Sequence, residues 1–124
     1  MDVRIDIEKK FDKDIKKLSS LDQTVISKKI NQLVDLLKEE KNTSTYLYKI
    51  HKFSIGGNLD SSLYVLKINK DLRIILTSEE DPLFNEHILT LLRVVRHDDL
   101  DKIFRGISES FNQSFLFKGG KENG

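Results

Sequence analysis

A histidine and a few cations in the second half of the sequence are the residues whose types and spacing could carry chemistry. His97 follows an apolar run, and an imidazole takes up and releases a proton near neutral pH. Arg73 lies inside another apolar segment, where a guanidinium can hold a phosphate through two hydrogen bonds. Lys67 precedes it across the short turn Lys70-Asp71. If Lys67 and Arg73 share a face of a hairpin, they form one phosphate site; otherwise they are a solvated pair.

Further cations flank these positions. Arg96 adjoins His97 and is placed to reach a phosphate, whereas Arg93 falls on the opposite face of the same strand and is predicted to pair with an acidic group of the helix layer. Lys49 and Lys52 belong to the basic segment YKIHKF, where strict alternation puts them on opposite sides. Each has an ordinary structural alternative, because strand arginines often cover the open face of a sheet and a terminal histidine can bond the following helix.

The charge of the chain is distributed unevenly. The whole sequence has a formal net charge of +1. Residues 42–76 hold five Lys or Arg against two Asp or Glu, a net +3, while residues 77–124 hold six against nine, a net −3. Screening confines an electrostatic field to about 8–10 Å, so a local basic segment can bind phosphate in a nearly neutral protein.

Several functional classes are excluded by composition. The sequence has no cysteine, which rules out a disulfide scaffold and a cysteine nucleophile. His51, His87 and His97 show no ligand-like spacing, so no metal or other cofactor is expected. The 124 residues fit one domain, predicted over 1–118 with a disordered tail at 119–124. Without a long apolar run or a secretory pattern, we expect a cytoplasmic protein with no membrane contact.

Hydrophobic periodicity predicts the elements that must position these side chains. Residues 3–7 alternate as a strand, a helical stripe begins at Phe11, and Ser20 with Gln23 forms a capping-box pattern for a second helix. Apolar runs predict three strands and a possible fourth, at residues 63–69, 72–77, 88–95 and 46–53. A last helix follows, with Asp98 or Asp99 as its expected cap. The predicted class is α+β, in the order β-α-α-β-β-β-α, with an αα hairpin and a C-terminal helix packed on a small antiparallel sheet.

Three stretches in this order resemble a known family. They are FDKDIKKL (residues 11–18), the hairpin LYVLKINKDLRII (residues 63–75), and LRVVRHDD (residues 92–99) followed by Ile103-Phe104. Together they are similar to the RelE/ParE superfamily of bacterial type II toxin–antitoxin toxins. The resemblance spans residues 3–105 and implies a RelE-like fold.

The resemblance implies a function as well as a fold. Members similar to RelE are metal-independent endoribonucleases that cleave mRNA in the ribosome, so the implied activity is that of an mRNA interferase. In that reading His97, Arg73 and Arg96 are the catalytic residues, and Lys49, Lys52 and Lys67 bind RNA or phosphate. A cognate antitoxin is the implied partner, and no face of the sequence indicates an obligate homo-oligomer.

A second set of features favours a toxin without catalysis. Asp98 and Asp99 stand where the nuclease branch often has a basic residue, and Phe104 stands where many members have a tyrosine. Members similar to ParE are not enzymes and instead bind and poison DNA gyrase. A decayed toxin that only binds its antitoxin is the third alternative.

Overall fold

The computed structural model describes residues 2–41, 47–54 and 60–107. The side chains of 49–54 and 60–61 lie outside this description, as does the predicted tail at 119–124. No helix among the described residues is long and apolar enough to cross a membrane. Within the same residues, no group of three or more His, Asp or Glu could hold a metal ion.

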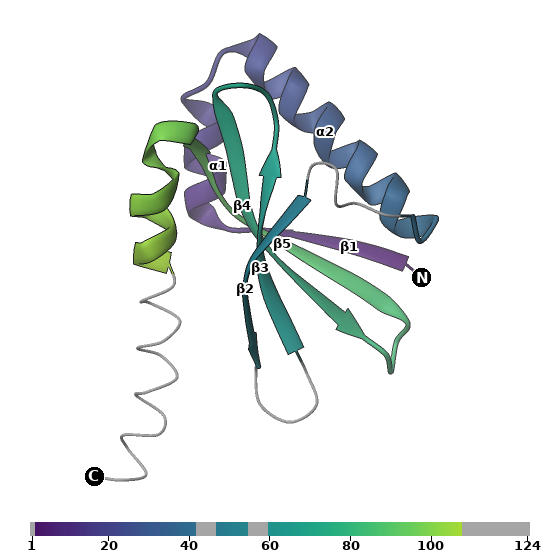
Figure 1. Ribbon diagram of the computed structural model, residues 1–124. Coiled ribbons are helices and arrows are strands. Elements are labelled where there is room, and N and C mark those ends of the chain that lie inside the picture. The colour runs from purple at the N-terminus through teal and green to yellow at the C-terminus, as the bar shows by residue number, and fades with distance from the viewer. Residues whose placement is uncertain (1, 42–46, 55–59, 108–124) are drawn as a thin grey trace, which may run out of the picture.

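Five strands and two N-terminal helices make an α+β fold (Figure 1). The elements are β1 (Asp2–Ile7), α1 (Lys9–Lys16), α2 (Ser20–Lys38), β2 (Leu47–Ser54), β3 (Asp60–Lys67), β4 (Leu72–Asp81) and β5 (Glu86–Arg96). A 3-10 turn, His97–Asp99, leads into a helix over residues 100–107. The three strands predicted from residues 63–95 are therefore present, and the possible strand near residues 46–53 is β2.

The sheet is mixed, which corrects the antiparallel sheet and the four-strand order expected from the sequence. Its strand order is β1-β5-β4-β3-β2. The pairs β2–β3, β3–β4 and β4–β5 are antiparallel, whereas β1 pairs with β5 in parallel. Alternation of apolar and polar residues in β1 predicts a half-buried strand but contains no information about its direction, so the sequence could not distinguish the two pairings.

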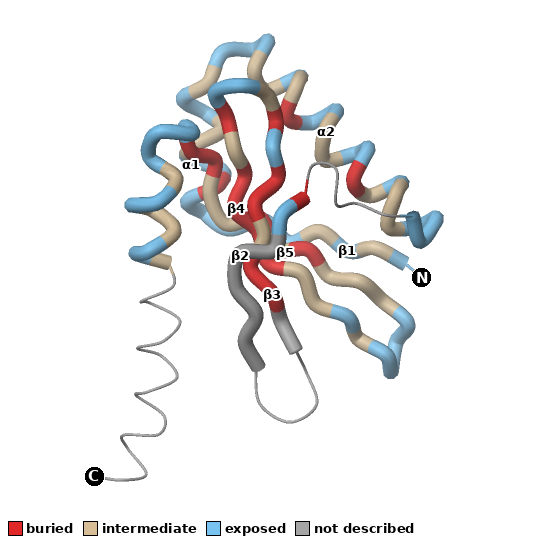
Figure 2. The backbone as a smooth tube through the Cα atoms, viewed as in Figure 1, coloured by how far each residue is buried: buried red, intermediate tan, exposed pale blue. Residues whose placement is uncertain are grey.

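Buried residues gather in the central strands of the sheet (Figure 2), and apolar side chains pack against both of its faces. On one face Phe11 of α1 and Ile26 and Leu33 of α2 pack against the buried side chains of β3, β4 and β5. On the other face Leu63, Ile75 and Val95 pack beneath the helix of residues 100–107, including Phe104. The helical stripes predicted for these segments are thus core-facing.

A β-bulge shifts the alternation of the β5 side chains between the two faces, so that Leu91 and Val94 both pack on the face of α1 and α2. Ile75 of β4 lies opposite Arg93 and Leu76 lies opposite Leu91, so Leu92 is an extra residue in β5. Leu91 packs on the face of α1 and α2, and Leu92 on the opposite face. The nearly continuous apolar run of β5 is therefore covered on both sides.

The start of α2 differs in detail from the predicted capping box. Ser19, not Ser20, is the N-cap, and its hydroxyl accepts a hydrogen bond from the Asp22 N–H at 3.1 Å. Gln23 is then one position too late to complete a capping box. Its amide nitrogen instead donates to the carbonyls of Ile15 and Leu18 at 3.0 and 3.1 Å, which joins the end of α1 to α2.

Candidate phosphate-binding and proton-transfer site

The turn between β3 and β4 is fixed by an asparagine. The Asn69 side-chain oxygen accepts hydrogen bonds from the backbone N–H groups of Asp71 and Leu72, at 2.9 and 2.8 Å. The Ile68 N–H donates to the Leu72 carbonyl at 3.1 Å and closes the turn. An asparagine whose side chain accepts a hydrogen bond from the backbone two residues later can stabilise a tight turn. It takes the place of the glycine that short hairpins usually prefer. This side chain was missed in the sequence reasoning, although an asparagine before Lys-Asp at a predicted turn is its usual signal.

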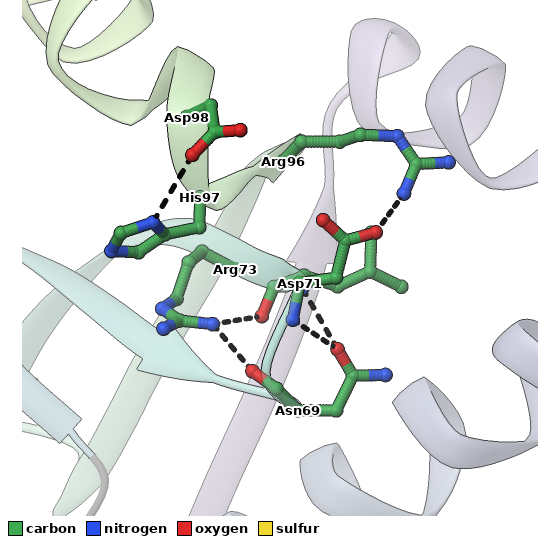
Figure 3. Close-up of polar contacts among 7 residues, drawn as sticks. Asn69, Asp71, Arg73, Arg96, His97 and Asp98 are labelled. Carbon is green, nitrogen blue, oxygen red and sulfur yellow. Dashed lines mark hydrogen bonds and ion pairs between the residues drawn. The ribbon is translucent and has the colours of Figure 1, made fainter.

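Lys67 and Arg73 meet across this turn. They are direct cross-strand partners in the β3–β4 ladder, so both lie on the same face of the sheet. Arg73 Nη1 donates to the backbone carbonyls of Asn69 and Leu72, the latter at 3.0 Å (Figure 3). No hydrogen bond to a described residue engages its Nε or Nη2. A half-buried guanidinium that is held at one nitrogen, and whose other two nitrogens have no hydrogen bond within the described part of the chain, is suited to binding an anion.

His97 lies at the end of β5 beside the same turn. Its backbone N–H donates to the Asp71 carbonyl at 2.7 Å, which attaches the strand end to the β3–β4 turn. Figure 3 shows the imidazole ring on the same side of the strand ends as the Arg73 guanidinium. Its Nδ1 is 3.5 Å from a carboxylate oxygen of Asp98, and the side chain is exposed. An exposed imidazole can exchange protons with solvent and with a bound substrate.

Arg96 is directed away from this group. It lies opposite Leu72 in the β4–β5 ladder, whereas Arg73 lies opposite Val95, so the two arginines occupy different faces. Its Nη1 donates to the Asp71 carboxylate, and Figure 3 shows the side chain extending to the other side of the turn. The structure therefore brings Lys67, Arg73 and His97 together and leaves Arg96 in a surface ion pair.

The other two predicted RNA-binding lysines lie on the edge strand β2. Lys49 is opposite Tyr64 and Lys52 is opposite Ser62 in the β2–β3 ladder. A register irregularity between Lys49 and His51 interrupts the strict alternation expected for this segment. The side chains of Lys49, His51 and Lys52 lie outside the described part of the chain. A role for the two lysines in binding RNA beside Arg73 therefore stays a prediction.

Asp98 and Asp99 do not cap the last helix, which corrects the predicted role. Both lie within the 3-10 turn, whose N-cap position is Arg96, and no side-chain cap bond forms there. The helical turn starts at His97, two or three residues earlier than a cap at Asp98 or Asp99 implies, so the two carboxylates fall inside its first turn. Their charge still faces the positive end of the helix dipole. The Asp98 side chain is 97% exposed, so it adds negative charge to the solvent side of the site.

Arg93 has the structural role predicted for it. Its Nε and Nη2 donate to the Asp14 carboxylate of α1 at 2.7 and 3.2 Å. The same carboxylate accepts the Val94 N–H at 2.9 Å. The hydrogen bond that Arg93 donates to the Asp14 carboxylate is the main reason that the pKa of Arg93 lies above its ordinary value. This ion pair attaches α1 to the half of β5 that continues past the end of β1.

Comparisons with known proteins support the fold. A solved structure, the archaeal RelE-RelB complex from Pyrococcus horikoshii OT3, contains a similar chain with a TM-score of 0.50 and 18% sequence identity. The match covers 77% of this chain and 96% of the other. No family model and no curated protein matches the sequence. The structural match confirms the RelE-like fold that the sequence resemblance implied.

Proposed function

We propose that this chain is the toxin of a type II toxin–antitoxin system, and that it is a metal-independent, ribosome-dependent mRNA endonuclease of the cytoplasm. The observation that carries the proposal is the placement of Lys67, Arg73 and His97 on one side of the sheet, at the end where β3, β4 and β5 meet the turn. Two cations can stabilise the charge that develops in phosphodiester cleavage without a metal, and a titratable ring can make one of its proton transfers.

The proposed reaction is attack of a ribose 2′-hydroxyl on the adjacent phosphorus. The new bond joins the 2′-oxygen to phosphorus, and the bond from phosphorus to the 5′-oxygen breaks, which leaves a 2′,3′-cyclic phosphate and a 5′-hydroxyl. Arg73 Nε and Nη2, with Lys67, stabilise the additional negative charge on the phosphoryl oxygens. His97 exchanges a proton at one of the two reacting oxygens, and water makes the other transfer, so the 2′-oxygen loses its proton and the departing 5′-oxygen gains one. Arg96 contributes to phosphate binding only if it leaves the Asp71 carboxylate, and Lys49 and Lys52 position the RNA.

The proposed partner is a small antitoxin with acidic residues. Residues 42–76 carry a net +3, and an acidic segment would be attracted to the surface that contains Lys67 and Arg73. The similar solved chain was crystallised as a RelE-RelB complex, which supports a partner of this kind. A homo-oligomer is not required for the proposed site, because all three of its side chains come from one chain.

Inducible expression in a bacterial host without antitoxin tests the proposal. We expect growth arrest with new RNA 5′ ends inside translated codons, and no arrest for the double variant Arg73→Ala, His97→Ala. Arg4→Ala is the matched control, because it removes an exposed arginine opposite Ile88, in the half of β5 away from this turn. Arrest by the double variant at the wild-type level would refute the assigned site.

A non-catalytic toxin that binds and poisons DNA gyrase is the second candidate. The exposed carboxylate of Asp98 beside His97 favours it, since negative charge repels an incoming phosphate. So does the ion pair that occupies Arg96. This candidate predicts growth arrest with intact mRNA and inhibited DNA supercoiling by purified gyrase. Absence of any arrest would instead favour the decayed toxin.

A further inference from the structure

The β3–β4 turn bonds two of the three proposed site residues through its backbone. The carbonyls of Asn69 and Leu72 accept from Arg73 Nη1, and the carbonyl of Asp71 accepts from the His97 N–H at 2.7 Å. Arg73 and the backbone of His97 are thus attached to one short loop, although Arg73 belongs to β4 and His97 follows β5 (Figure 3).

One side chain determines the shape of that loop. The Asn69 oxygen accepts from the N–H groups of Asp71 and Leu72, and these N–H groups belong to two of the residues that supply the anchoring carbonyls. The turn has no glycine and none of its residues has a positive φ. Its conformation therefore depends on the asparagine side chain rather than on a permissive backbone.

We propose that Asn69 is a positioning residue of the site: its side chain fixes the turn, and the turn holds Arg73 and the His97 backbone in their relative places. This inference rests on the proposed endonuclease function and deepens it. Asn69 does not itself contact the substrate in this scheme. Its effect reaches the reaction through the carbonyls of Asn69, Asp71 and Leu72.

Removal of the Asn69 side-chain oxygen would leave the N–H groups of Asp71 and Leu72 with water as their acceptor, and the turn would lose its fixed conformation. The carbonyls that orient Arg73 and His97 would then shift together. A displacement of about 1 Å in a reacting group can reduce a rate on the order of 10²-fold. RNA affinity depends on several cations, including Lys67, so it changes less. We therefore expect the rate at saturation to fall while the half-saturating concentration stays nearly constant.

Single-turnover cleavage on ribosomes programmed with mRNA separates these two quantities. For Asn69→Ala we expect the rate at saturating protein to fall by about 10- to 100-fold with little change in the half-saturating concentration. Asn69→Asp keeps the acceptor oxygen and adds a negative charge. It should recover most of the rate at saturation while raising the half-saturating concentration. Asn85→Ala, at the turn between β4 and β5, is the matched control and should cleave at the wild-type rate.

Three results would overturn the inference while the proposed function stands. They are a wild-type rate for Asn69→Ala, an equal loss for Asn69→Asp and Asn69→Ala, and an equal loss for the Asn85→Ala control. Inactivity of the wild-type protein on programmed ribosomes would instead refute the proposed function itself, and the inference with it. Amide hydrogen exchange supplies an independent readout, since the His97 N–H should lose protection in Asn69→Ala and keep it in Asn69→Asp.

Discussion

The Asp14 carboxylate should be worth more to stability than any exposed ion pair on the same helix. It accepts three hydrogen bonds, two from Arg93 and one from the Val94 N–H, and its side chain is 14% exposed. Hydrogen bonds to a charged group contribute about 1.5–3 kcal/mol, and a backbone N–H that loses its acceptor costs about 1 kcal/mol or more. Because the Arg93 side chain is 28% exposed, water replaces part of the loss. We expect Asp14→Ala to reduce the free energy of unfolding by about 2–3 kcal/mol.

The variant Asp14→Asn separates the contribution of charge from that of hydrogen bonding, and Asp12→Ala provides a control. Asp14→Asn keeps a carbonyl oxygen for the Val94 N–H but removes the charge, so the loss should be about 1–2 kcal/mol. Asp12→Ala is the control on the same helix. Its carboxylate is 3.0 Å from Lys16 in an exposed i,i+4 pair, for which about 0.5 kcal/mol or less is expected.

Urea unfolding, followed by circular dichroism and extrapolated to water, measures these differences. The m-value should stay constant, because the surface exposed on unfolding is unchanged. A double-mutant cycle between Asp14→Ala and Arg93→Gln should give a coupling of about 1–2 kcal/mol. If Asp14→Ala falls within about 0.5 kcal/mol of the wild type, as ordinary surface variants do, the reasoning from this carboxylate is wrong.

Four other substitutions have defined outcomes. Leu33→Ala truncates a fully buried side chain of α2 and should reduce the free energy of unfolding, measured in urea, by about 2–5 kcal/mol. Ser19→Ala should cost about 1 kcal/mol by the same measurement, and Ser20→Ala much less, because Ser19 is the cap. Burial lowers the pKa of His87, with Glu80 acting in the opposite direction. The unfolded chain therefore binds a proton first as the pH falls below about 6.5. Wild-type unfolding free energy should decrease from pH 7 to pH 5, and His87→Gln should reduce that slope; equal slopes would contradict the assignment.

Local pattern was sufficient for the hairpins and for one part of the site. A turn of a few residues between two apolar runs leaves little freedom in register, so the pairing of Lys67 with Arg73 could be anticipated from spacing. Arg96 shows where this reasoning fails. It is next to His97 in the sequence, but successive residues of a strand point to opposite faces, and its guanidinium bonds Asp71 instead.

Features that depend on distant parts of the chain could not be predicted. The sequence pattern does not reveal the bulge at Leu92, because both faces of β5 are buried and an apolar residue suits either of them. The partner of Arg93 was predicted as an acidic group of the helix layer, yet four carboxylates of α1 and α2 fit that description. Asp14 is the partner because the fold places it against Arg93 and Val94, in the part of β5 that extends past its pairing with β1.

The parallel pairing of β1 with β5 has a consequence for the order of folding. Asp2 lies opposite Glu86, more than eighty positions later, whereas β3, β4 and β5 pair through short turns. Closing a long loop costs more entropy than closing a hairpin, so we expect the β3–β4–β5 meander to form first and β1 to join last. All three proposed site residues, Lys67, Arg73 and His97, belong to that meander and the turn that follows it. Formation of the site and closure of the sheet are therefore separable steps, and a variant that detaches β1 should destabilise the domain without rearranging the site.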